Sequence, residues 1–426
     1  MAAKNEFSIS ELVCAISEAA DLVSPVLGSH HKKVSSIAGS IAREMNLPSY
    51  YIQDIVLAAM LHDIGAFTIG ERVKTLAFQS CENGMDRHSL LGYQLLKNFR
   101  PLARAAVLIQ YHHADYDASR DEVPLGSYIL HLADRAAILF NDRREVLEQI
   151  PEITQKVIEI HHRFHPGVLA AFLRLSKLEY VWLGAFLPPH GAVLMRKRQV
   201  TAETMELETL RDFAKVIARI IDFRSRFTAT HSSGVAAVAR ELTRLSGFSE
   251  RECDLMEIAG LLHDLGKLAV PSEILEKSGK LNREEFNVIR KHAYYTYVIL
   301  SKVNGLEDIA TWAAYHHERQ DGTGYPFHVS GEDFPRLACV MAVADVLTAL
   351  TEDRPYRRGM DKEQAMRILF SMAESGAIGL GIVELADKNF FRINSVRAMA
   401  QQQAQKDYEA FYRATDQLYT EKAMSA

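Results

Sequence analysis

The chain has 426 residues, which is enough for two or three domains, and 48% of them are hydrophobic. Its formal net charge of −5 at pH 7 argues against a DNA- or RNA-binding surface, because such a surface normally carries an excess of basic residues. No CxxC pair is present, so we expect a cytoplasmic protein whose cysteines are reduced thiols: Cys14, Cys81, Cys253 and Cys339.

The N-terminal residues show no signal-peptide pattern. The most apolar long stretch begins at Val168, but Arg174, Lys177 and Glu179 interrupt it. A membrane span requires a longer uncharged run, so we expect no membrane association.

The pattern of apolar residues predicts an all-α protein. Proline is sparse, and apolar residues recur every three or four positions, for example over residues 34–45 and 235–245. The "PPHG" run at 188–191 breaks any helix. We therefore predict two helical domains, a linker and a polar helical tail, at residues 8–185, 206–400, 186–205 and 401–426 respectively.

A histidine–aspartate motif occurs twice, as "LHDIGA" at 61–66 and as "LHDLGK" at 262–267. The two HD pairs lie 201 positions apart, as do His30 and His231. Further histidines and a final aspartate follow in the same order in each half. The N-terminal set is His30, His62, Asp63, His88, His112, His113 and Asp134. The C-terminal set is His231, His263, Asp264, His292, His316, His317 and Asp345.

Imidazole and carboxylate ligands without thiolate suit iron, manganese or a similar divalent ion. Each set has five histidines and two aspartates, which is too many for one tetrahedral zinc. The number suits two six-coordinate ions that share a water and the aspartate of the HD pair. Two such ions clamp the attacking and leaving oxygens in phosphoryl transfer, so the sequence predicts this chemistry.

The order of these residues resembles the HD phosphohydrolase superfamily, and the C-terminal half resembles an HD-GYP domain. The motifs that carry the resemblance are "HDLGK" at 263–267, "HHERQDGTGYP" at 316–326 and "ADVLTALTEDRPYRRGM" at 344–360. The resemblance covers nearly all of residues 220–370. It implies a metal-dependent phosphodiesterase that hydrolyses a 3′,5′-cyclic dinucleotide through a two-metal-activated water. Cyclic di-GMP and 3′,3′-cyclic GMP-AMP are both open as substrates, with a linear 5′-phosphorylated dinucleotide, or mononucleotides, as products.

The resemblance also implies ligand sets. His231, His263, Asp264 and Asp345 would hold one ion, and Asp264, His292, His316 and His317 would hold the other. Members with a third ion use a Glu four residues before the first histidine. That position is Phe227 here, so we predict two metals, with iron or manganese as the first choices.

Substrate contacts are implied in the same way. Lys267 would face the phosphate and stabilise charge that develops on it. Gly324, Tyr325 and Pro326 would form a tight loop at the ligand, where Tyr325 either stacks on a base or braces the loop. Arg354 and Arg357 would contact the nucleotide or lie at a solvated helix end. Thr348 departs from the family, in which Asp is common.

The N-terminal half keeps all seven ligand-type residues but not the other catalytic groups. Ala66 stands where Lys267 stands, the GYP loop is missing, and the double histidine lies 21 rather than 28 residues before the last aspartate. We predict a degenerate HD domain that can still bind metal. It is either a regulatory binding module or a structural remnant.

An alternative function is a non-hydrolytic cyclic dinucleotide receptor or signalling scaffold. Lys267 and the GYP loop argue against it, whereas Thr348 is compatible with it. A homodimer or a signalling partner protein is open under either function.

Overall fold

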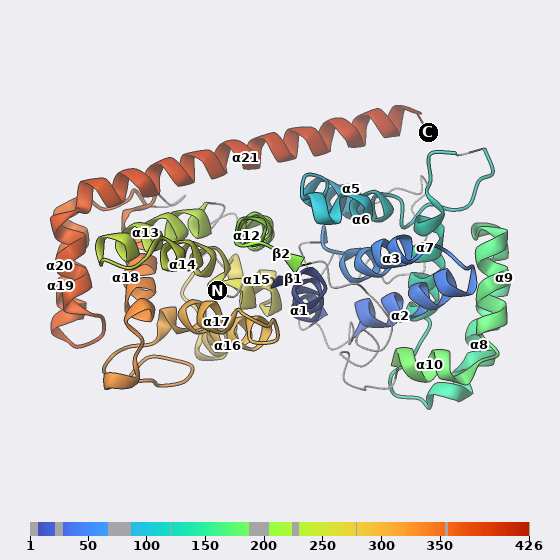
Figure 1. The fold of residues 1–426 in the computed structure, drawn as a ribbon, viewed down its shortest axis with the longest axis horizontal. Coiled ribbons are helices and arrows are strands. Elements are labelled where there is room, and N and C mark those ends of the chain that lie inside the picture. The colour runs from blue at the N-terminus through green and yellow to red at the C-terminus, as the bar shows by residue number, and fades with distance from the viewer. Residues whose placement is uncertain are drawn as a thin grey trace, which may run out of the picture. The chain divides into compact units, whose positions relative to one another are not determined.

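The computed structural model describes residues 7–21, 29–66, 87–119, 121–186, 204–223, 230–277, 279–353 and 357–425 (Figure 1). Internal contacts divide the chain into two compact units. The C-terminal unit comprises Met1–Ala15 and Thr204–Tyr412, and the N-terminal unit comprises Ile16–Glu203 and Arg413–Ala426. Each unit therefore includes a short segment from the opposite end of the chain.

The N-terminal unit is built around α2 (His30–Glu44), which packs on α3 (Ser49–Leu61) and α7 (Leu125–Ile138). Val34, Ile37 and Ile41 lie on one face of α2 and are buried, as expected for an amphipathic helix. The remaining helices are α5 (Arg87–Leu96), α6 (Ala103–Gln110), α8 (Val146–Glu159), α9 (Pro166–Leu175) and α10 (Glu179–Phe186), with 3₁₀ turns at Arg100–Leu102 and His161–Arg163. Helix α1 (Ile9–Asp21) contains residues of both units.

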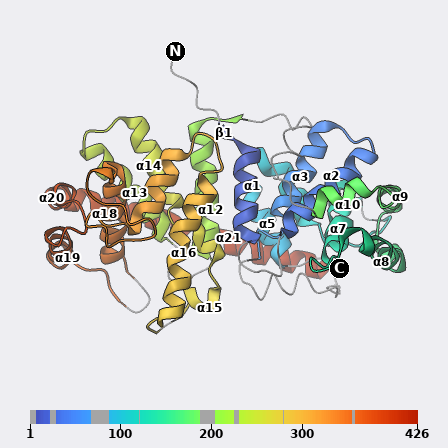
Figure 2. The same cartoon turned by 90° about the horizontal axis from the view of Figure 1, so that it is seen from below.

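The C-terminal unit repeats this arrangement with α13 (His231–Leu245) packed on α14 (Glu250–Leu262) and α18 (Arg336–Thr351) (Figure 1 and Figure 2). The other α-helices are α12 (Leu207–Phe223), α15 (Ser272–Leu275), α16 (Arg283–Leu300), α17 (Glu307–Ala314), α19 (Lys362–Glu374), α20 (Leu380–Lys388) and α21 (Phe390–Ser425). The 3₁₀ helices are η4 (Leu265–Ala269), η5 (Tyr315–His317) and η6 (Gly331–Asp333).

The first described residues of the chain belong to the core of the C-terminal unit. Strand β1 (Phe7–Ser8) pairs antiparallel with β2 (Thr204–Met205), and Phe7 lies opposite Met205. Both of these side chains are buried. In α1, the Glu11 carboxylate accepts hydrogen bonds from Asn304 N at 3.0 Å and Asn304 Nδ2 at 2.8 Å. The N-terminal segment is therefore fixed to the C-terminal unit by pairing, burial and hydrogen bonds.

The prediction of an all-α protein is confirmed, because β1 and β2 are the only strands among the described residues. The two predicted amphipathic helices are α2 and α13. Of the predicted linker, residues 187–203 lie outside the described residues. The predicted tail is part of α21, which begins at Phe390. Among the described helices, none combines the length and apolar character that crossing a membrane requires.

Candidate metal centres

The seven candidate ligands of the C-terminal unit, which we call the C-terminal cage, come from five places in the fold. His231 is the first residue of α13, His263 and Asp264 directly follow α14, His292 lies in α16, His316 and His317 lie in η5, and Asp345 lies in α18. The closest groups are His292, His316 and His317, and His231, His263 and Asp264, whose ligand atoms lie within 4.8 Å of one another in each group. His231 Nε2 also lies 3.1 Å from Asp345 Oδ1.

Asp264 links the two groups. Its Oδ2 lies 3.2 Å from His263 Nε2, and its Oδ1 lies 3.4 Å from His292 Nε2. The carboxylate is buried, and although burial alone raises its pKa, the neighbouring His263 and Lys267 hold the pKa of Asp264 well below its ordinary value. A charged carboxylate with each oxygen facing a different histidine has the geometry required to bridge two cations.

The histidine rings are held with Nε2 toward the cage. His263, His292 and His316 each place Nδ1 at a carbonyl oxygen three residues earlier, at 2.8, 2.6 and 2.6 Å. Because Nδ1 donates there, a neutral ring carries its lone pair on Nε2. The Nε2 atoms of His292 and His316 nevertheless lie only 3.1 Å apart. Two facing lone pairs call for a cation between them, so these residues fit a divalent ion.

Burial lowers the pKa of His292 to about 3 and that of His317 to about 4, which keeps both imidazoles neutral and able to ligate. His231 differs. Burial lowers its pKa too, but hydrogen bonds to Asp345 and Glu352 outweigh burial and raise the pKa of His231 to about 10. Metal binding at His231 must therefore displace a proton.

Glu352 is a site residue that the sequence analysis did not select. Its Oε2 lies 3.1 Å from His231 Nδ1, its side chain is buried, and Gln401 Nε2 donates to the same oxygen at 2.9 Å. A carboxylate behind a ligating imidazole fixes the ring and raises its basicity. The spacing was an available signal, because Glu352 lies seven residues after Asp345, two helical turns away.

Replacing Glu352 by Gln is expected to weaken metal binding by about 10- to 100-fold, because the ring of His231 loses its charged partner. Competition with a fluorescent chelator measures this affinity. Glu363→Gln is the control, because Glu363 is exposed on α19. Equal affinities of the two variants would contradict a role for Glu352 in orienting His231.

Lys267 and the GYP loop border the C-terminal cage. Lys267 Nζ lies 2.6 Å from Asp264 Oδ2. Tyr325 packs its ring 4.9 Å from that of His317, between centroids, and its N donates to His317 O at 3.1 Å. The Arg290 guanidinium lies 4.8 Å from the centre of the Tyr325 ring. The loop is thus attached directly to a candidate ligand.

Close backbone contacts and a buried carboxylate fix the shape of the GYP loop and of the HDxG motif. A Cβ on Gly324 would lie 2.3 Å from Arg319 N, so only glycine allows this close approach. The buried Glu318 carboxylate accepts hydrogen bonds from Phe327 N at 2.6 Å and His328 N at 3.2 Å, next to Pro326. In the HDxG motif, a Cβ on Gly266 would lie 1.9 Å from His292 O, which explains the glycine after Leu265.

Four further positions named in the sequence analysis have different surroundings or lie outside the described residues. Arg357 donates from Nη2 to Ala349 O at 2.6 Å, at the end of α18. Arg354 and Phe227 lie outside the described residues. Thr348 is fully buried in α18.

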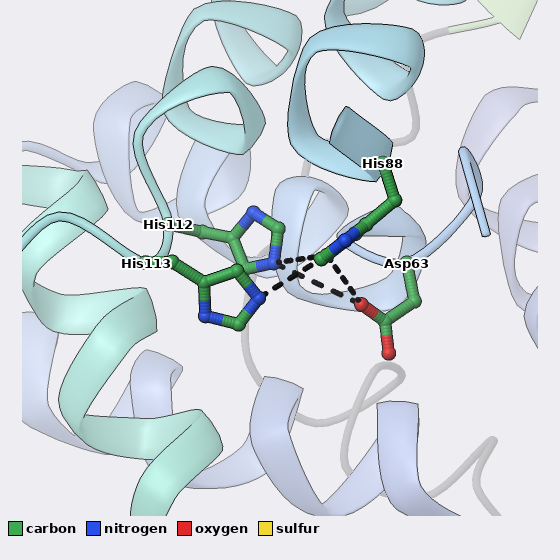
Figure 3. Close-up of side chains that lie close together, drawn as sticks. All are labelled: Asp63, His88, His112 and His113. Atoms are coloured by element: carbon green, nitrogen blue, oxygen red, sulfur yellow. Dashed lines mark hydrogen bonds and ion pairs between the residues drawn. The ribbon is translucent and has the colours of Figure 1, made fainter. Parts of the chain in front are cut away.

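The seven candidate ligands of the N-terminal unit, which we call the N-terminal cage, also converge. Figure 3 shows Asp63, His88, His112 and His113 pointing toward one another. His88 Nε2 lies 3.3 Å from Asp63 Oδ1, 3.3 Å from His112 Nε2 and 3.1 Å from His113 Nε2.

The other ligands of the N-terminal cage lie beside this group. His30 Nε2 lies 3.1 Å from Asp134 Oδ1, and His62 Nε2 lies 3.4 Å from Asp63 Oδ2. The buried Nε2 atoms of His30 and His62 and the Oδ1 atom of Asp63 make no well-formed hydrogen bond with any part of the chain that the structure describes. Buried polar atoms of this kind normally have a partner, so this cage also fits a metal ion.

Asp222 is a second buried carboxylate that sequence reasoning missed. It lies on α12 and accepts a hydrogen bond from Ser232 Oγ at 2.8 Å. Burial raises its pKa to about 7. In the unfolded chain the pKa of Asp222 is about 4. Between these two values the metal-free native state therefore holds a proton on Asp222 that the unfolded state has released. The contribution of Asp222 to the free energy of unfolding therefore falls as pH rises from about 4 to 7, by at most about 1.4 kcal/mol per pH unit.

Replacing Asp222 by Asn is expected to raise the thermal midpoint of the metal-free chain clearly at pH 8 and much less at pH 5. The amide keeps an acceptor for Ser232 but removes the charge that must be buried above pH 7. Thermal unfolding at the two pH values, with exposed Asp308→Asn as the control, measures this difference. Equal shifts at both pH values would contradict the titration of Asp222.

Comparison with known proteins relates both halves to one domain class. The HD domain family matches residues 215–379 and again residues 27–139. The 3′3′-cGAMP-specific phosphodiesterase 1 of Vibrio cholerae is 29% identical over 376 residues, which cover 84% of this chain and 86% of that protein. The cyclic di-GMP phosphodiesterase response regulator RpfG of Xanthomonas campestris is 35% identical over 182 residues, which cover 42% of this chain and 48% of that protein.

The fold has a solved counterpart. A crystal structure of a cyclic GMP-AMP-specific phosphodiesterase of V. cholerae matches with a TM-score of 0.65 and 22% identity, over 90% of this chain and 98% of that chain. The chain carries two HD domains, a domain of metal-dependent phosphohydrolases. The predicted relationship to cyclic dinucleotide phosphodiesterases is confirmed.

Proposed function

We propose that the C-terminal unit hydrolyses a 3′,5′-cyclic dinucleotide, either cyclic di-GMP or 3′,3′-cyclic GMP-AMP. Water adds to phosphorus, the bond from phosphorus to the 3′ oxygen breaks, and the 3′ oxygen takes a proton. The product is a linear 5′-phosphorylated dinucleotide, which is open to further cleavage to mononucleotides. The relative that is similar over 84% of this chain is named for the mixed ring, which favours 3′,3′-cyclic GMP-AMP as the first substrate to test.

The observation that carries this proposal is the placement of Asp264, with one histidine at each oxygen and Lys267 at one of them. His231, His263, Asp264 and Asp345 would hold one ion, and Asp264, His292, His316 and His317 the other. Iron or manganese suits these donors. When bound, such ions supply positive charge to the phosphate and lower the pKa of a bound water.

The chain itself supplies a further cation and a boundary for the substrate. Burial lowers the pKa of Lys267, but the Asp264 carboxylate outweighs this effect and raises it above its ordinary value, so the ammonium stays charged. A charged ammonium beside Asp264 can stabilise the charge that develops on a phosphate oxygen. Gly324, Tyr325 and Pro326 would border the nucleotide, and Arg354 and Arg357 would contact it.

In the N-terminal unit we propose metal binding without phosphodiesterase activity. All seven ligand-type residues converge, but Ala66 provides no cation and the GYP loop is absent from its sequence. This unit would act as a regulatory module.

The experiment that tests the catalytic proposal is product chromatography. Manganese- or iron-loaded protein is incubated with cyclic di-GMP and, in parallel, with 3′,3′-cyclic GMP-AMP. We expect a linear dinucleotide from at least one ring, and no product after chelation. No product from either ring, in protein with measured metal content, would replace the proposal with the receptor or scaffold alternative.

A further inference from the structure

The histidine that follows the first ligand of the N-terminal cage has no counterpart in the C-terminal cage. His31 follows His30, whereas Ser232 follows His231, and the two positions are 201 residues apart. Ser232 donates to Asp222, as described above. His31 Nδ1 contacts the carboxylate of Asp21, which lies 201 residues before Asp222. The repeat has therefore replaced a serine–aspartate pair with a histidine–aspartate pair.

The imidazole of His31 lies at the N-terminal cage. Its side chain is buried, and its ring centroid is 5.1 Å from that of His62. One ring nitrogen of His31 lies within 4.8 Å of ligand atoms of both His62 and Asp63. Because Asp21 accepts the proton on Nδ1, the neutral ring carries its lone pair on Nε2. A carboxylate behind an imidazole in this way orients the ring as a metal ligand.

The two cages also differ in the group beside the aspartate of the HD pair. In the C-terminal cage, the ammonium of Lys267 lies 2.6 Å from Asp264 Oδ2. The corresponding Asp63 has Ala66 in place of that lysine and His31 beside it. A positive group suited to phosphate is thus exchanged for a neutral group suited to metal.

A second exchange occurs after the last aspartate. Arg135 follows Asp134, whereas the hydrophobic Val346 follows Asp345. Arg135 is buried, and its Nη2 lies 2.9 Å from Asp134 Oδ2 and 3.3 Å from His113 Nδ1. The guanidinium brings a fixed positive charge to two candidate ligands of the N-terminal cage, whereas in the C-terminal cage the ammonium of Lys267 lies at Asp264.

We propose that His31, oriented by Asp21, is an additional ligand that closes the N-terminal metal site to phosphate. This inference rests on the proposal that the N-terminal cage binds metal. Structural metal sites have all positions filled by protein, whereas catalytic sites keep a position open. The N-terminal site is thus a closed centre that binds a divalent ion without binding a phosphodiester.

The test uses the full chain with His263→Ala and Asp264→Ala, which disable the C-terminal cage. Mn²⁺ affinity is measured by competition, metal content by mass spectrometry, and the site by Mn²⁺ electron paramagnetic resonance. We expect His31→Ser to weaken Mn²⁺ binding at least tenfold, and Asp21→Asn to weaken it less. The exposed His161→Ser is the matched control and should bind normally. Circular dichroism of the metal-free proteins confirms that each variant is folded.

Inorganic phosphate provides the second readout. The parent protein is the full chain that carries only His263→Ala and Asp264→Ala. Phosphate should leave its Mn²⁺ spectrum unchanged, but should alter the spectrum of the His31→Ser variant, where a coordination position has opened. Unchanged Mn²⁺ affinity in both His31→Ser and Asp21→Asn would overturn the role of His31. A parent that binds no Mn²⁺ at all would instead overturn the underlying proposal of a metal in the N-terminal unit.

Discussion

Replacing Asp264 by Ala is expected to abolish metal-dependent hydrolysis of the cyclic dinucleotide, with a loss of more than about 10³-fold in turnover. Asp264 is the one residue of the C-terminal cage whose oxygens face both a histidine after α14 and a histidine in α16. Its loss removes the shared carboxylate and leaves the surrounding imidazoles without the buried negative charge. Product formation and metal content, measured on the same sample, test this expectation.

The control for this variant is Asp308→Asn on the exposed first turn of α17, which should keep full activity. Asp264→Asn is a useful second variant, because it keeps the shape of the side chain and therefore the fold. Turnover that survives in both Asp264 variants would refute the assignment of the C-terminal cage as the catalytic centre.

Replacing Lys267 by Met is expected to lower kcat by about 10²- to 10³-fold, the usual cost of losing one group that stabilises charge in the transition state. The Met side chain keeps most of the apolar stem, and Lys267 is not a proposed metal ligand, so the metal content should be retained. Steady-state kinetics with measured metal occupancy test this. Lys277→Met is the control, because Lys277 is exposed and forms an ion pair with Glu285. A fall in kcat that follows metal loss would show a structural rather than an electrostatic role.

Much of the fold was predictable because helical patterns are local. The apolar spacing that predicts helices at 34–45 and 235–245 is the spacing that buries one face of α2 and of α13. The order of histidines was equally informative, since a repeat preserves the sequence positions of residues that meet in space. Both sets of seven residues do meet, with Asp345 joined to its set through His231.

The remaining site residues depend on contacts between elements, which no local pattern reveals. Glu352 acts on His231 from 121 positions away, and Asp222 reaches Ser232 from a different helix. His31 carried a signal, the adjacent pair of histidines at 30–31, but its meaning required the position of Asp21. The pairing of β1 with β2 joins Phe7 to Met205, which are far apart in the sequence. Neither dipeptide on its own predicts this pairing.

That pairing has a consequence for how the protein is made and handled. Strand β1 leaves the ribosome long before its partner β2 exists, so Phe7 must wait for most of the N-terminal unit to be synthesised before it is buried. A gene fragment that starts at residue 206 would encode a C-terminal unit without either strand and with part of its core exposed. For the same reason, a tag or fusion joined just before β1 is attached to the C-terminal unit, although the N-terminal unit follows it directly in the sequence.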